Sequence, residues 1–198
     1  MPFYRYSPLM RLVRVQLLAA AMVLGVADLS AAADQPAAPP AFIHPALPEA
    51  TLQGQGQMRF LGLLIYDARL WAGPRFEAAD FDAYPLALEL TYHRTFTGTA
   101  IAQRSIEEIE RQGKLPPAQA QRWLTALIAA LPDVQPGDRL TGLYQPGVGM
   151  RLWHGRQALA AIDDAELARR FFAIWLSPST SEPDLRNDLL ALESGTGS

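Results

Sequence analysis

The chain of 198 residues contains no cysteine. This absence excludes disulfide bonds, thiol nucleophiles and every metal or iron–sulfur site that needs a cysteine ligand. Histidine is scarce as well: His44, His93 and His154 lie far apart and form no pair with the spacing of metal ligands. We therefore expect neither a metal nor a cofactor.

The motifs of several common enzyme classes are also missing. No G-x-S-x-G elbow of a serine hydrolase occurs. The short glycine pairs at 54–56 and 147–149 lack the third glycine and the strand–helix context of a nucleotide loop, so we expect turns there. The net charge of −3 gives no general attraction for nucleic acid or for anionic membranes.

The N-terminus has the pattern of a secretory signal peptide. Three arginines (Arg5, Arg11 and Arg14) precede an apolar run at 15–26, and small residues follow at 31–33. The apolar run is too short to span a bilayer as a stable helix. We predict cleavage before Asp34 and export to the periplasm, with no stable membrane insertion after processing. The alternative is an uncleaved segment that tethers the protein to a membrane.

Residues 34–50 are rich in proline and predict an extended lead-in. A single domain is expected over 51–193, followed by a flexible tail at 194–198. Apolar alternation predicts a long strand over 58–71 and a second over 86–94. Helical spacing follows at 99–111 and 118–131, then three short strands (139–144, 148–153, 158–162) and two helices, at 164–176 and after Ser181. This order is typical of an α+β domain.

Arg94 is the most informative polar residue in this pattern. Together with Tyr92 it continues the alternating apolar face of the strand at 86–94, the face we expect the helices to cover. A cation on a covered face needs an anionic partner or a ligand, unless it leaves for solvent at the strand end. Arg94 is therefore either a ligand-binding residue or a solvated strand terminus.

Three segments resemble the bacterial, exported chalcone isomerase-like proteins: MRFLGLLIYDARLW at 58–71, LELTYHRTFTGTAIAQRSIEEIERQG at 88–113 and FFAIWLSPSTSEPDLRNDLLAL at 171–192. The resemblance covers about 53–192. It implies an open-faced β-sandwich of the chalcone isomerase type, with a large antiparallel sheet, a helical layer on one side and a ligand cleft between them.

The resemblance does not carry the enzymatic residues with it. The family's threonine and tyrosine, which position water or the ketone, match Leu61 and Ile101, and its ligand-binding helix lysine and asparagine match Arg104 and Glu108. No arginine stands immediately before Gly54, where the catalytic arginine would fall. The resemblance therefore implies the fold, whereas the activity has little support.

Two further residues are candidates for ligand contact, and each has a simpler explanation. Arg104 could line the cleft, or it could pair with Glu107 and Glu108 on a solvated helix face. Tyr66 could contact the ligand, or it could pack in the core beside its strand neighbours.

Our leading functional hypothesis is a non-catalytic binding protein for a small, largely apolar or amphipathic ligand. A carboxylate is one head group to expect, since plastid relatives that resemble this fold bind fatty acids. The ligand-binding residues would be Arg94, Tyr92, Arg104 and Tyr66, with no metal. An isomerase or intramolecular lyase with an altered active site is the alternative. A protein-interaction module without a cavity is the third possibility.

Overall fold

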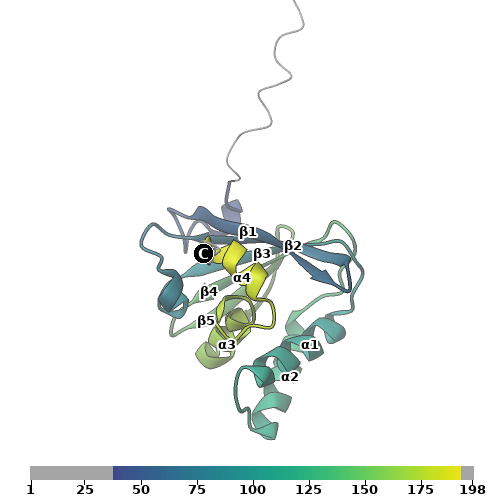
Figure 1. Ribbon diagram of the computed structural model, residues 1–198. Coiled ribbons are helices and arrows are strands. Elements are labelled where there is room, and N and C mark those ends of the chain that lie inside the picture. Colours follow the sequence, from purple (N-terminus) through teal and green to yellow (C-terminus); the bar gives the residue numbers. More distant parts are fainter. Residues whose placement is uncertain (1–37, 193–198) are drawn as a thin grey trace, which may run out of the picture. The chain divides into compact units, whose positions relative to one another are not determined.

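Six strands form one antiparallel sheet in which each strand pairs with its neighbours in the sequence (Figure 1). The structure is a computed structural model that describes residues 38–192, so the expected signal peptide and the tail lie outside the described residues. The strands are β1 (Thr51–Phe60), β2 (Leu63–Ala72), β3 (Leu86–Tyr92), β4 (Arg139–Gln145), β5 (Gly149–His154) and β6 (Gln157–Ile162).

Two helical pairs complete the fold. The β3–β4 connection holds α1 (Gly98–Arg111) and α2 (Pro117–Ala130), and α3 (Ala165–Leu176) and α4 (Pro183–Leu190) follow β6. Short 3-10 helices occur at η1 (Ala41–Ile43) and η2 (Ala78–Ala83). The predicted α+β architecture, an open sheet with helices on one face, is therefore confirmed. Of the helices within 38–192, none combines the length and the apolar character needed to cross a membrane.

Side-chain caps fix where two of the helices begin. The Thr97 hydroxyl accepts a hydrogen bond from the Ala100 amide at 3.1 Å, and Asp164 accepts one from Leu167 at 2.9 Å. Each bond satisfies an amide that has no partner inside the first helical turn. Ser181, which its spacing to Asp184 predicts as a cap, does not cap α4, because the N-cap residue is Glu182 and makes no side-chain cap bond.

The predicted single strand over 58–71 is in fact a hairpin. The chain reverses at Leu61 and Gly62, both of which adopt positive φ, at +50° and +80°. Leucine rarely adopts this conformation. The Leu61-Gly62 turn also lacks the Asn-Gly pair that is usual in a tight hairpin. The segment up to Phe60 belongs to β1 and pairs with β2 across the turn.

The predicted turn at 54–56 is also wrong, because both glycines lie inside β1. A Cβ on Gly54 would come within 2.1 Å of the Asp188 carbonyl oxygen, and one on Gly56 within 2.8 Å of the Asp188 Cβ. These glycines let α4 rest directly on the strand, as close backbone approach requires.

The helices cover one face of the sheet, and the N-terminal segment covers part of the other. On that second face Ile43, Leu47 and Ala50 are buried against Trp71, Ala87 and Leu143. The expected lead-in over 34–50 is therefore not merely extended chain, because the described part of it contributes to the core. We regard 41–50 as part of the folded domain.

Candidate ligand-binding cavity

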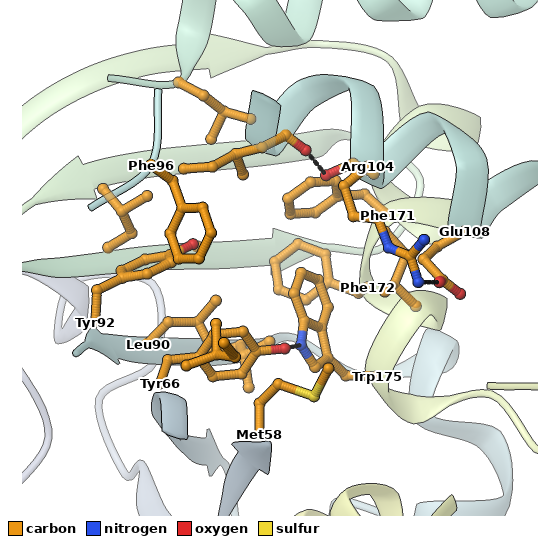
Figure 2. A pocket seen from close by; sticks show the side chains of 18 of the residues that line it. Met58, Tyr66, Leu90, Tyr92, Phe96, Arg104, Glu108, Phe171, Phe172 and Trp175 are labelled. Carbon is orange, nitrogen blue, oxygen red and sulfur yellow. Dashed lines mark hydrogen bonds and ion pairs between the residues drawn. The ribbon is translucent and has the colours of Figure 1, made fainter. Parts of the chain in front are cut away.

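A cavity of about 430 Å³ lies between the helical face of the sheet and the helices α1 and α3. All six strands contribute to one wall, and the opposite wall comes from α1, α3 and the residues just before α4 (Figure 2). A volume of this size is in the range that holds small ligands. Most of the lining is apolar and includes Met58, Leu88, Leu90, Phe96, Ile101, Leu140, Leu152, Phe171, Phe172 and Trp175.

Aromatic side chains give the cavity its shape. Tyr66 and Tyr92 meet edge to face, with ring centroids 5.7 Å apart, and Phe96 continues this contact at 6.1 Å from Tyr92. On α3 the ring of Phe171 packs against Trp175 at 5.4 Å. Edge-to-face contacts between large rings hold their positions well, so these walls are defined by packing as well as by the backbone.

Burial raises the pKa of both tyrosines well above the usual phenol value. At Tyr66 a hydrogen bond from Trp175 Nε1 to the phenol oxygen, at 2.9 Å, counteracts part of the rise. At Tyr92 the neighbouring Tyr66 adds to the effect of burial. Both groups are therefore neutral phenols at any physiological pH, suited to hydrogen bonding and not to proton abstraction.

Four polar side chains gather where α1 meets the residues just before α4. Together with Tyr66 of β2, whose pKa responds to the charges of Glu182, Glu108 and Arg104, we call them the polar end. Its members are Tyr66, Arg104, Glu108, Ser181 and Glu182, all of which line the cavity. Figure 2 shows Arg104 and Glu108 joined at one side of the cavity, with Tyr92 and Phe96 at the other.

Glu108 is the centre of the polar end. Its side chain is only 6% exposed, yet its two oxygens are held by Arg104 Nη2 and by the Ser181 hydroxyl, which donates at 2.9 Å. Arg111 Nε lies 3.7 Å from the same carboxylate. A buried carboxylate is tolerated because these donors satisfy it.

The second carboxyl group of the polar end, that of Glu182, has a different environment from that of Glu108. Burial raises the pKa of the Glu182 carboxyl, and the negative charge of Glu108 raises it further. Arg104 opposes this shift without cancelling it. The polar end thus holds one carboxylate that is well paired and a second one that is not.

The structure places three of the four predicted ligand-binding residues in the cavity lining. Tyr66, Tyr92 and Arg104 line it. Arg94 does not, because β3 ends at Tyr92 and the chain leaves the face before reaching it. Arg94 is exposed, and its Nε donates to the Leu64 carbonyl oxygen at 3.4 Å, a position that fits the alternative of a solvated strand end.

Two positions matched to the family's catalytic residues behave differently from each other. Leu61 is 86% exposed at the hairpin turn, whereas Ile101 lines the cavity. Glu108, which its neighbours led us to place on a solvated face, is buried. Ile101, Ser105 and Glu108 follow one another at helical spacing on one side of α1, and that spacing could have revealed the cavity face.

No cluster of potential metal ligands occurs among residues 38–192. The chemistry available in the cavity is therefore apolar contact, together with hydrogen bonding and charge at the polar end.

The described residues form an α+β domain. Its open antiparallel sheet lies beneath a helical layer, with a mainly apolar cavity between them. The family model for chalcone isomerase-like proteins matches residues 72–191, and the chain belongs to that family.

Comparison with solved structures gives the same fold. The crystal structure of a fatty-acid binding protein from Arabidopsis thaliana superimposes with a TM-score of 0.56, covering 72% of this chain and 87% of the other. The two sequences are only 12% identical. No curated protein matches the chain in sequence.

Proposed function

We propose that this protein binds a small, largely apolar molecule in the cavity and does not transform it. The observation that carries the proposal is the cavity itself, about 430 Å³ enclosed mainly by aliphatic and aromatic side chains. Burying an apolar molecule there gains about 25 cal/mol for each Å² removed from water. The similarity in fold to a fatty-acid binding protein supports a ligand with an apolar body.

The alternative of an isomerase or intramolecular lyase has weaker support. The two phenols in the cavity are held neutral by burial, and Leu61 lies outside the cavity. The guanidinium in the lining, that of Arg104, is engaged by Glu107 and Glu108. The sequence has no arginine immediately before Gly54 that could stabilise developing negative charge. This absence favours binding over catalysis.

A cavity-filling substitution tests the proposal. Ile101→Trp adds an indole to the cavity wall and is expected to weaken binding of a neutral fluorescent probe, N-phenyl-1-naphthylamine, by about tenfold or more. The matched control is Ile128→Trp, the same change at a side chain of α2 that is 41% exposed and outside the lining. The measurement is a fluorescence titration, with circular dichroism to verify folding. Full affinity in a folded Ile101→Trp protein would contradict the proposal.

We further propose that binding takes place in the periplasm. The basis is the sequence pattern of residues 1–33, a basic head followed by a short apolar run and small residues. N-terminal sequencing of the protein from a periplasmic extract is expected to begin at or within a few residues of Asp34. Recovery of the intact N-terminus in the membrane fraction would instead establish a tether.

A further inference from the structure

We propose that the polar end selects a neutral ligand head that can donate a hydrogen bond, an alcohol or a phenol, in preference to a carboxylate. This inference rests on the proposed function, because it assigns the head group of a ligand whose apolar body fills the same cavity. It follows from the balance of charges at the polar end and from the hydrogen-bonding groups that remain there.

The charge balance is unfavourable to an anion. Among the cavity-lining residues of the polar end, two are carboxylates, Glu108 and Glu182, and one is a cation, Arg104. A ligand carboxylate would be a third negative group facing a single lining cation, since Arg111 lies outside the lining, 3.7 Å from the Glu108 carboxylate. Like charges at close range in a poorly solvated site repel strongly, and the raised pKa of Glu182 shows that this site already disfavours a second negative charge.

The cation is also engaged. One terminal nitrogen of Arg104 contacts Glu107 at 3.1 Å, and the other contacts Glu108. A bidentate pair with a ligand carboxylate would need both nitrogens. Forming that pair would release Glu108, whose buried carboxylate would then lose one of its donors.

A hydroxyl head meets neither obstacle. It can donate its proton to the Glu182 carboxylate, which has no guanidinium partner among the ion pairs of residues 38–192. It can also accept from Tyr66, because Trp175 donates to the Tyr66 oxygen and leaves the phenol proton available. A hydrogen bond to a charged partner in a partly buried site is among the stronger kinds.

The test compares three probes built on a ten-carbon chain, at pH 8: 1-decanol, decanoate and methyl decanoate. They share an apolar tail and differ in the head, which is a neutral donor, an anion and a neutral acceptor respectively. Titration calorimetry, or displacement of the naphthylamine probe, gives their affinities for the mature protein. We expect 1-decanol to bind about tenfold more tightly than decanoate, with methyl decanoate weaker than 1-decanol.

A pair of variants assigns the selectivity to the polar end. Glu182→Gln removes the unpaired carboxylate and is expected to raise decanoate affinity severalfold while lowering that for 1-decanol. The matched control is Glu110→Gln, the same change at an exposed side chain of α1 outside the lining, which is expected to leave the affinity ratio unchanged. The charged groups that act on Glu182, namely Glu108, Arg104, Asp184 and Arg111, are intact in both variants.

Each result has a distinct meaning. Decanoate binding as tightly as 1-decanol would overturn the inference and leave the proposed function standing. Equal affinities for 1-decanol and methyl decanoate would remove the need for a donor and overturn it as well. An unchanged ratio in Glu182→Gln would show that the polar end does not select the head. Failure of all three probes and of the naphthylamine to bind would count against the proposed function itself.

Discussion

Replacing both Ile43 and Leu47 with alanine is expected to lower the free energy of unfolding by about 5 kcal/mol. The two side chains are buried on the face of the sheet opposite the helices, Ile43 completely. Their removal opens space above Trp71, Ala87 and Leu143, where the remaining apolar neighbours are the small Ala50 and the partly buried Phe42, Ala46, Leu52 and Trp153. The loss combines the lost transfer free energy with the cost of the cavity left behind.

Urea denaturation followed by tryptophan fluorescence measures this effect as a shift of the unfolding midpoint. The control is His44→Ala with Glu49→Ala, two exposed positions of the same segment, for which we expect less than about 0.5 kcal/mol. If the double Ile43/Leu47 variant were as stable as the control, residues 41–50 would be a lead-in outside the core, as the sequence pattern first indicated.

Gly54→Ala is expected to destabilise the protein by about 3 kcal/mol or more. The new Cβ would lie 2.1 Å from the Asp188 carbonyl oxygen and 2.5 Å from that of Leu189. Both neighbours are backbone atoms of the final helix, so no side-chain rotation relieves the clash. The strand or the helix must move, and their packing is lost in part.

Gly73→Ala is the matched control, because a Cβ there meets nothing within 4 Å. We expect this change to be neutral, within about 0.5 kcal/mol. Thermal unfolding of both variants gives the comparison. Equal stability of Gly54→Ala and Gly73→Ala would show that α4 does not rest on β1 as closely as the structure indicates.

The strongly periodic segments could be predicted from the sequence. Strict alternation at 86–92 correctly placed Leu86, Leu88, Leu90 and Tyr92 beneath the helices, since only one face of a strand can meet the core. Helical spacing likewise located the four helices. The α+β class followed from the order of these elements.

Features set by long-range packing could not be predicted in this way. The hairpin turn uses a leucine at positive φ, for which local propensity gives no indication. The burial of Ile43 depends on a sheet face formed by strands far along the chain. The burial of Glu108 could not be predicted either. Its spacing to Arg104 is that of an ion pair on any exposed helix. Ser181, which donates a hydrogen bond to Glu108, lies 73 residues away.

The position of α1 and α2 within the topology has a consequence for hydrogen exchange. Within the described chain, all six strands pair with their sequence neighbours, and the helical excursion at 98–130 takes no part in that pairing. Its amides can therefore open to solvent without breaking the sheet, as a unit of lower local stability. Residues of this excursion, of α3 and of the segment just before α4 line the cavity. A molecule held there opposes the detachment of α1, so occupancy slows exchange in a helix that forms no part of the sheet.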